Sequence, residues 1–294
     1  IVEKYGRIFQ PDVLKKYSAK LSNICSSILA STGIIIIYSQ YIDGGTIPMA
    51  LALEEMGFTK YGSGDYTQSL FTKPPTEPID AITMKPKSQF RSSVSSFKPA
   101  KYILITGDKA FSPRNTEEVK IASSSDNAHG EMIKVIIISK AGSEGLDFKN
   151  IRQIHILDPW YNLNRIEQII GRGVRNLSHC ALPFDERNVE IYMHSTSLIG
   201  EQKDEEAIDV YVYRLAKKKA DKIGQVTRLL KETAVDCLLN LGQTEFTVSN
   251  LNAMAENQNV TLELSTQKQK LVYKIGDKPH TDICDYMDTC QTKC

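Results

Sequence analysis

The sequence reads Gln168-Ile169-Ile170-Gly171-Arg172-Gly173-Val174-Arg175 at its most informative point. The apolar spacing around it predicts a helix over residues 164–174, so that Arg172 and Arg175, three residues apart, share one helical face. A guanidinium keeps its charge, and its fork of donors matches the oxygens of a phosphate. This stretch therefore predicts a grip on a ligand that carries phosphate groups.

A strand and a glycine-bearing turn precede that helix, in Ile136-Ile137-Ile138-Ser139-Lys140-Ala141-Gly142-Ser143-Glu144-Gly145-Leu146-Asp147. Glycine adopts backbone conformations that leave amide groups exposed, and such N–H groups can donate hydrogen bonds to phosphate oxygens. The turn is therefore a second candidate for contact with phosphate.

Apolar runs without polar alternation recur along the first two thirds of the chain and are typical of parallel strands covered on both faces. We expect strands at 34–38, 102–106, 135–139, 153–157 and 189–193, and helices at 11–29, 47–56, 117–122 and 164–174. Strands that alternate with helices favour an α/β fold with a parallel sheet. We assign it to residues 1–200.

Residues 60–101 differ from their surroundings, with five prolines and seven basic against three acidic side chains. This composition predicts a long surface insertion outside the core. It is either a solvated loop or a contact for nucleic acid or a protein partner.

Residues 201–294 form a predicted C-terminal extension. Apolar residues step by three or four from Ile208 to Leu241, and Gly224 leaves one helix or two equally open. Residues 210–231 carry seven basic side chains and one acid, which indicates either a solvated face or a nucleic-acid backbone contact. Two short apolar runs, 260–264 and 271–275, predict a small β-hairpin.

Composition bounds the remaining possibilities. The chain has 294 residues, 41% hydrophobic and 24% charged, with a net charge of +1, so any basic surface is local. No apolar run approaches the roughly 18 residues needed to cross a bilayer, and we predict no membrane partner. The first residues, Ile1-Val2-Glu3-Lys4, resemble neither a start nor a signal peptide, and we expect a segment of a longer protein.

Three of the six cysteines lie near the C-terminus. His280, Cys284, Cys290 and Cys294 offer the donor types of a zinc site, although their spacing is not that of a familiar finger. The alternatives are part of a larger zinc site or free thiols. Because no secretory segment is present, we expect reduced cysteines.

The pattern Q-x-x-G-R-x-x-R at residues 168–175 resembles motif VI of superfamily 2 helicases, and residues 139–147 resemble motif V. The resemblance implies a second RecA-like domain in which Arg172 and Arg175 act as catalytic arginine fingers. It further implies that Gln168 lies near the γ-phosphate, and that Gly145 and Asp147 face the nucleotide.

The same resemblance assigns the nucleic-acid contacts. Motif IV corresponds to Ser39 and Gln40, the following turn motif to Thr106, and the start of motif V to Ser139 and Lys140. Hydroxyl and amide donors position a sugar-phosphate backbone without reading its sequence. The implied substrate is a nucleic-acid strand, either DNA or RNA.

The sequence lacks the motifs that hold the other side of a nucleotide. It contains no G-x-x-x-x-G-K-[ST] loop, and no acidic DExx box precedes residue 39. We expect ATP and Mg²⁺ to be bound mainly by an N-terminal RecA-like domain, and this chain alone not to hydrolyse ATP.

Residues 11–58 and 101–242 resemble helicase-like proteins of large nucleocytoplasmic DNA viruses, including the poxvirus early transcription factor and nucleoside triphosphatase and their mimivirus and asfarvirus counterparts. This resemblance implies a role in viral transcription, viral RNA polymerase as a partner, and a location in the virion and the viral factory of the host cytoplasm. The alternative function is a non-catalytic module that recruits polymerase or another viral transcription protein.

Overall fold

The computed structural model describes residues 2–62, 69–71, 75–91, 96–140, 145–200, 204–239 and 259–294. Two compact units divide the chain. The first comprises residues 1–159 and 165–210, and the second comprises residues 160–164 and 211–294. The sequence instead predicts a single boundary at residue 200.

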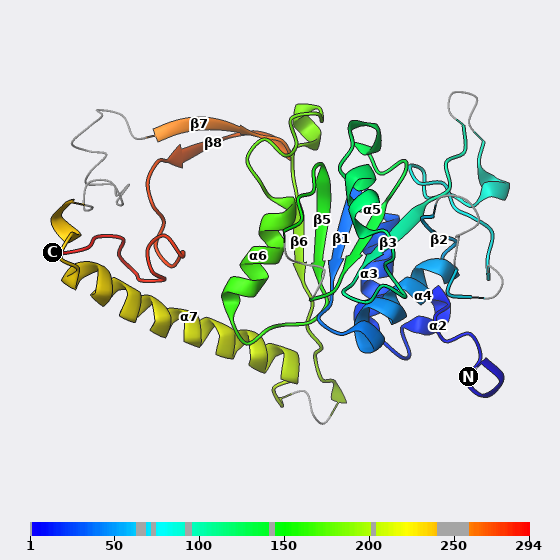
Figure 1. Ribbon diagram of the computed structural model, residues 1–294, viewed down its shortest axis with the longest axis horizontal. Coiled ribbons are helices and arrows are strands. Elements are labelled where there is room, and N and C mark those ends of the chain that lie inside the picture. The colour runs from blue at the N-terminus through cyan, green and yellow to red at the C-terminus, as the bar shows by residue number, and fades with distance from the viewer. Residues whose placement is uncertain are drawn as a thin grey trace. The chain divides into compact units, whose positions relative to one another are not determined.

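Six parallel strands form the sheet of the first unit, in the order β2-β3-β4-β1-β5-β6 (Figure 1). They are β1 (Ile34–Tyr38), β2 (Thr59–Lys60), β3 (Lys101–Ile105), β4 (Val135–Ile138), β5 (Ile151–Ile156) and β6 (Glu190–Met193). The predicted α/β class and the five predicted strands are confirmed, and β2 is an addition.

The central strand shows why these residues form a sheet. Ile34 to Ile37 are fully buried, and Ile36 lies opposite Ile136 of β4 and Ile154 of β5. β-branched side chains pack well on a pleated surface, and a strand covered on both faces needs no polar residues.

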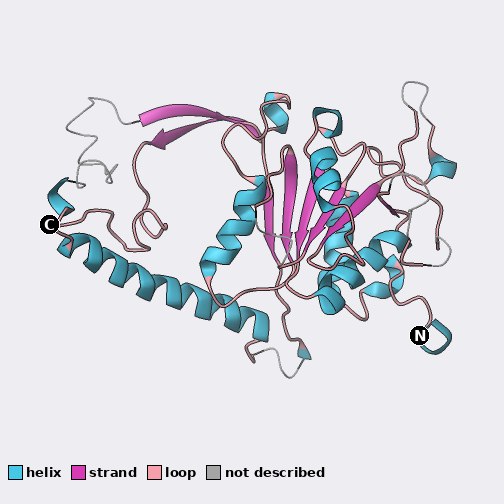
Figure 2. Ribbon diagram, viewed as in Figure 1, coloured by secondary structure: helices cyan, strands magenta, loops and turns pink. Residues whose placement is uncertain are grey.

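Helices cover the sheet (Figure 2). The helical elements are α1 (Val2–Tyr5), α2 (Pro11–Leu14), α3 (Ala19–Leu29), η1 (Ile42–Thr46), α4 (Ile47–Glu55), η3 (Lys87–Gln89), α5 (Asn115–Ala122), η4 (Ser125–Asn127), α6 (Leu163–Gly173) and η5 (Phe184–Glu186). Ile24 of α3 and Leu53 of α4 share one buried cluster with Ile35 and Ile37 of β1. These two helices therefore cover the same face of the sheet.

The single helix predicted over residues 11–29 is wrong, because two helices, α2 and α3, occupy this range. Ser18 has an extended backbone (φ −150°, ψ 102°), and its Oγ accepts a hydrogen bond from the amide of Leu21 at 3.3 Å. A serine in this geometry caps the start of a new helix.

The prediction that residues 60–101 lie outside the core is wrong for their described parts. Ile79, Ala81, Met84 and Ala100 belong to the main buried cluster. The carboxylate of Glu54 in α4 accepts hydrogen bonds from the backbone amides of Leu70 (2.9 Å) and Phe71 (3.2 Å) and from the hydroxyl of Ser69 (2.5 Å). Proline and serine content indicated a solvated segment, but buried acids elsewhere in the fold supply its hydrogen-bond partners.

The helix α7 (Ile208–Thr233) starts at the end of the first unit, and from residue 211 onward it belongs to the second. The second unit also contains the antiparallel pair β7 (Asn259–Leu264) and β8 (Gln267–Lys274). The predicted hairpin is confirmed, and α7 is one helix through Gly224. No described helix has the length and apolar character needed to cross a membrane.

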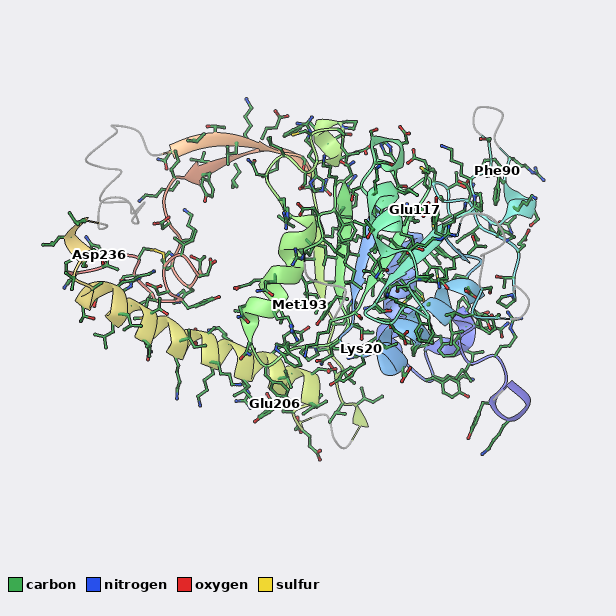
Figure 3. All side chains as sticks on the ribbon, in the orientation of Figure 1. Lys20, Phe90, Glu117, Met193, Glu206 and Asp236 are labelled. Atoms are coloured by element: carbon green, nitrogen blue, oxygen red, sulfur yellow. A yellow bond between two sulfur atoms is a disulfide. The ribbon has the colours of Figure 1, made fainter. Side chains whose placement is uncertain are left out.

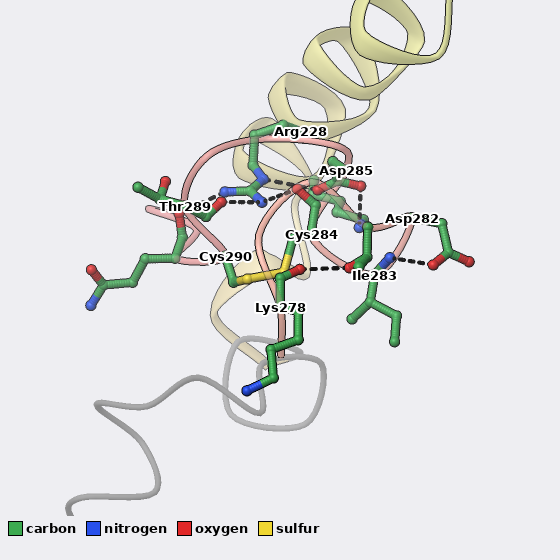
Figure 4. Close-up of a disulfide and its surroundings, with 11 residues drawn as sticks. Arg228, Lys278, Asp282, Ile283, Cys284, Asp285, Thr289 and Cys290 are labelled. Carbon is green, nitrogen blue, oxygen red and sulfur yellow. Dashed lines mark hydrogen bonds and ion pairs between the residues drawn. A yellow bond between two sulfur atoms is a disulfide. The ribbon is translucent and has the colours of Figure 1, made fainter. Parts of the chain in front are cut away.

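A C-terminal clasp, residues 280–294, packs on α7 in this second unit. Arg228 donates to Asp285 Oδ2 (2.8 Å) and to the carbonyl oxygens of Gln291 (2.7 Å) and Cys284 (3.0 Å) (Figure 4). Disulfides join Cys237 to Cys294 and Cys284 to Cys290.

The disulfides correct two expectations at once. The cysteines at 284, 290 and 294 are neither reduced nor available to zinc, because each is bonded to another sulfur. Within the described ranges no group of three or more His, Cys, Asp or Glu side chains could hold a metal ion. The sequence could not show this pairing, since it depends on how the tail folds back onto α7.

Candidate nucleotide and nucleic-acid interface

The predicted motif VI arginines contact the predicted motif V loop. Nη1 of Arg172, in the last turn of α6, donates to the carbonyl oxygen of Leu146 at 3.1 Å. Nη1 of Arg175 forms an ion pair with Asp147 Oδ1. Two stretches that are more than twenty residues apart in sequence therefore form one site.

The two arginines do not share a helical face as predicted, because α6 ends at Gly173 and Arg175 lies beyond it. Beyond this end, Ser178 Oγ accepts from the backbone amide of Arg175 at 3.4 Å and donates to its carbonyl oxygen at 2.9 Å. Nε of Arg175 donates to the carbonyl oxygen of Gly171 at 2.8 Å. Ser178 therefore holds the backbone of Arg175, and the last turn of α6 holds its guanidinium.

Gly173 fixes how closely α6 packs on the sheet. A Cβ at this position would lie 3.0 Å from side-chain atoms of Ile151 and Ile154 in β5. The arginine-bearing end of α6 is thus held against the sheet by the absence of a side chain.

The remaining predicted nucleotide contacts are exposed. Gly145 has φ +70°, a conformation that favours glycine, and no atom lies within 4 Å of where its Cβ would be. Gln168 is exposed on α6. Gly142, whose amide the sequence also proposed as a phosphate donor, lies outside the described residues.

The predicted nucleic-acid residues follow three adjacent strands and share the carboxyl edge of the sheet. Thr106 follows β3, Ser139 follows β4 and Ser39 follows β1. The amide of Ser139 donates to Ile105 O (2.9 Å), and the amide of Ser39 donates to Ile138 O (3.2 Å). Residues far apart in sequence therefore lie in a row.

Two of the predicted hydroxyl donors are turned inward. Ser39 is buried, and its Oγ donates to Asp158 Oδ2. Thr106 is buried, and its Oγ1 shares a hydrogen bond of 3.0 Å with Ser112 Oγ. Both hydroxyls therefore hold turns in place in this structure, and their role in ligand binding stays a prediction.

The other three residues of this set differ in exposure. Ser139 Oγ is buried, with no hydrogen-bond partner in the structure. Gln40 is half-buried, and its Nε2 donates to Pro159 O at 3.4 Å. Lys140 is exposed. A ligand on this edge of the folded domain would meet Gln40 and Lys140 first.

Sequence reasoning missed a polar cluster at the same edge. Nζ of Lys20, in the first turn of α3, donates to Leu157 O (3.1 Å) and to Asp209 Oδ2 (2.9 Å). Lys20, labelled in Figure 3, lines one pocket together with His194, the residue that follows β6. No short motif contains these residues, so only the parallel strand order could have indicated the cluster.

Two histidines extend this cluster into the interior. Nδ1 of His155 and Nε2 of His194 are 2.9 Å apart and share a hydrogen bond. Burial, together with the neighbouring His194, lowers the pKa of His155 to about 3. Burial and the ammonium of Lys20 also lower the pKa of His194. Both rings are therefore neutral near pH 7.

The parallel sheet and its flanking helices have the expected RecA-like α/β architecture. Residues 84–176 match the helicase conserved C-terminal domain. Over these residues the chain is similar to the C-terminal domain of helicases.

Its relatives come from large DNA viruses. A termination factor NPH-I homolog of African swine fever virus (isolate Warthog/Namibia/Wart80/1980) is 29% identical over 236 residues, 76% of this chain and 33% of that protein. Putative helicase 087L of Invertebrate iridescent virus 3 is 28% identical over 243 residues, 81% and 22% of the two chains. Putative ATP-dependent RNA helicase R350 of Acanthamoeba polyphaga mimivirus is 38% identical over 132 residues, which are 43% of this chain and 16% of that protein.

The matched region thus spans a third or less of each of these relatives. Among solved structures, the C-terminal part of the Fun30 ATPase domain aligns with 70% of this chain and 50% of its own. Its sequence identity is 14% and its TM-score is 0.39, a similarity too low to carry an argument.

Proposed function

We propose that this chain is the C-terminal half of an ATP-dependent nucleic-acid helicase or translocase. Its part is to bring Arg172 and Arg175 to a nucleotide that an N-terminal RecA-like domain holds with Mg²⁺. The observation that carries the proposal is the contact of both arginines with residues 146 and 147, which places the two guanidinium groups beside one loop. Gln168 and Gly145 complete the nucleotide-facing surface.

The chemistry assigned to the arginines is charge stabilisation. In phosphoryl transfer, negative charge spreads over the oxygens of the transferred group, and a guanidinium supplied from outside the nucleotide-binding loop stabilises it. This chain lacks the phosphate-binding loop, so we expect it to bind nucleotide weakly and not to hydrolyse ATP by itself.

The strand contacts are assigned to the carboxyl edge of the sheet. Gln40 and Lys140 would contact the sugar-phosphate backbone, and closing of the two domains around ATP would shift this edge along the strand. We place the activity in viral transcription, with viral RNA polymerase as partner, in the virion and the viral factory of the host cytoplasm.

The test uses the full-length protein that contains this chain. Arg175→Ala should lower kcat for ATP by about 10³-fold, within the range that arginine fingers contribute. Arg91→Ala, which removes an exposed arginine outside the site, should leave kcat unchanged. If ATP hydrolysis survives both Arg172→Ala and Arg175→Ala, the proposed helicase or translocase function is wrong.

A binding module remains the second candidate because α7 exposes apolar side chains. Ile223, Val226 and Leu230 are exposed, and the exposed basic residue Lys222 lies beside them. A module that only recruits polymerase or another transcription protein would keep its function when Arg172 and Arg175 are both replaced by alanine. It would lose that function with Val226→Asp and Leu230→Asp.

A further inference from the structure

We propose that Asp147 is an exchangeable counter-ion for Arg175, which holds this arginine while no triphosphate is bound. Resemblance alone assigns Asp147 to the nucleotide; the structure assigns its carboxylate to the arginine instead. The inference rests on the proposed function, since it concerns what Arg175 does before ATP arrives.

The contacts of Arg175 leave it ordered but not locked. Its Nε donates to Gly171 O at 2.8 Å, while its Nη1 pairs with Asp147. The two side chains are 42% and 67% exposed, so water screens the pair. Exposed ion pairs contribute little to stability and exchange partners readily. Asp147 can therefore be displaced by a stronger anion.

Arg172 provides an internal contrast. Its Nη1 donates to the neutral carbonyl oxygen of Leu146, and its Nε is buried without a hydrogen-bond partner in the structure. A neutral acceptor does not compete with phosphate as a carboxylate does. Among the residues that the structure describes, an acidic side chain pairs with Arg175 and none is recorded for Arg172.

The competition favours a triphosphate over a diphosphate. The γ-phosphate, which a diphosphate lacks, can accept two parallel hydrogen bonds from a guanidinium as a carboxylate can, and it carries more negative charge. Bound ATP would therefore take Arg175 from Asp147. After hydrolysis and loss of phosphate, the carboxylate would recover the guanidinium and favour reopening. The exchange concerns only the non-covalent partner of Arg175, and it makes or breaks no covalent bond.

The test compares Asp147→Asn and Asp147→Glu in the full-length protein. The asparagine keeps the shape and removes the charge, so Arg175 no longer needs to be released. We expect KM for ATP to fall about threefold with kcat unchanged, because an exposed pair is weak. Inhibition by ADP should not change, and Asp147→Glu, which keeps the carboxylate charge, should not show this fall in KM.

A double-mutant cycle separates this inference from the proposed function. Dissociation constants for the non-hydrolysable analogue AMP-PNP with Mg²⁺ are measured for the wild type, Asp147→Asn, Arg175→Ala and the double variant. The asparagine should tighten binding only when Arg175 is present. If Arg175→Ala leaves kcat intact, the proposed function fails whatever Asp147 does.

Three outcomes would contradict the counter-ion role of Asp147 without contradicting the proposed helicase or translocase function. A rise in KM for Asp147→Asn means that the carboxylate holds the nucleotide directly. A fall in kcat comparable to that of Arg175→Ala means that Asp147 acts in the chemical step. Equal KM values for all Asp147 variants mean that the ion pair does not compete with ATP.

Discussion

Gly224 lies in the interior of α7, where glycine costs about 1 kcal/mol relative to alanine. A Cβ at this position would lie 1.9 Å from the carbonyl oxygen of Asp285 in the clasp. The backbone of residue 285 therefore needs the space that a side chain would fill, and the helix accepts the cost of a glycine.

This residue gives a prediction for the second unit. Gly224→Ala should displace the clasp from α7, because backbone atoms cannot move aside as the end of a flexible side chain can. Hydrogen exchange at residues 284–291 should become faster, with the loss of the contacts that Arg228 makes there.

Gln225→Ala is the matched control, since it changes the neighbouring exposed position of the same helix. Unchanged exchange at residues 284–291 in Gly224→Ala would show that the clasp tolerates the added methyl group.

For Ser39 and Thr106 the sequence predicts the position of the residue but not the direction of its side chain. Their positions after β1 and β3 were predictable, since each ends an apolar run. The direction of their hydroxyls was not, because Asp158 and Ser112, which bind them, come from other parts of the chain or from the turn itself.

At the scale of elements, α4 joins the insertion to the sheet. Glu54 is buried, and its Oε1 also accepts a hydrogen bond from the hydroxyl of Tyr102 in β3 at 2.7 Å. Thr76 Oγ1 donates to the carbonyl oxygen of Glu55 at 3.2 Å. One turn of helix therefore fixes the path of a segment rich in proline and serine.

Glu54→Gln should lower the free energy of unfolding by about 2 kcal/mol, because hydrogen bonds to a charged group are lost and an amide cannot accept at both ends. Urea denaturation measures the loss, and limited proteolysis within residues 69–91 should become faster.

The matched control is Glu117→Gln on α5, whose carboxylate is exposed (labelled in Figure 3). A stability loss equal to that of Glu54→Gln would indicate a general charge effect and not an anchor for the insertion.

At the scale of the whole molecule, the pair His155 and His194 couples stability to pH. Unfolded histidine titrates near pH 6.5, whereas His155 in the fold has its pKa lowered to about 3. The unfolded chain therefore binds more protons below pH 6.5. The stabilisation is complete above that pH and is lost progressively as the pH falls toward 3.

When the pH falls from 7.5 to 5.5, protonation of His155 in the unfolded chain should lower the free energy of unfolding by about 1 kcal/mol. The measurement is urea denaturation at both pH values. In His155→Gln this pH dependence should be smaller, because glutamine does not titrate. An equal slope in wild type and variant would place the acid sensitivity elsewhere.

The sequence alone determined the sheet and predicted the residues of the site. Runs such as Ile34–Ile37 have no polar alternation, and only a strand buried on both faces accommodates them. The order of motifs likewise predicted that Arg172 and Arg175 lie near residues 145–147, and both arginines contact residues of this stretch, Leu146 and Asp147.

Tertiary structure decided which partners the described motif residues contact. It paired Arg175 with Asp147, turned the hydroxyls of Ser39 and Thr106 inward, and packed part of the insertion into the core. These outcomes depend on partners brought together by folding. Local pattern predicts which backbone forms, but only the packed chain fixes which charges and hydrogen-bonding groups meet.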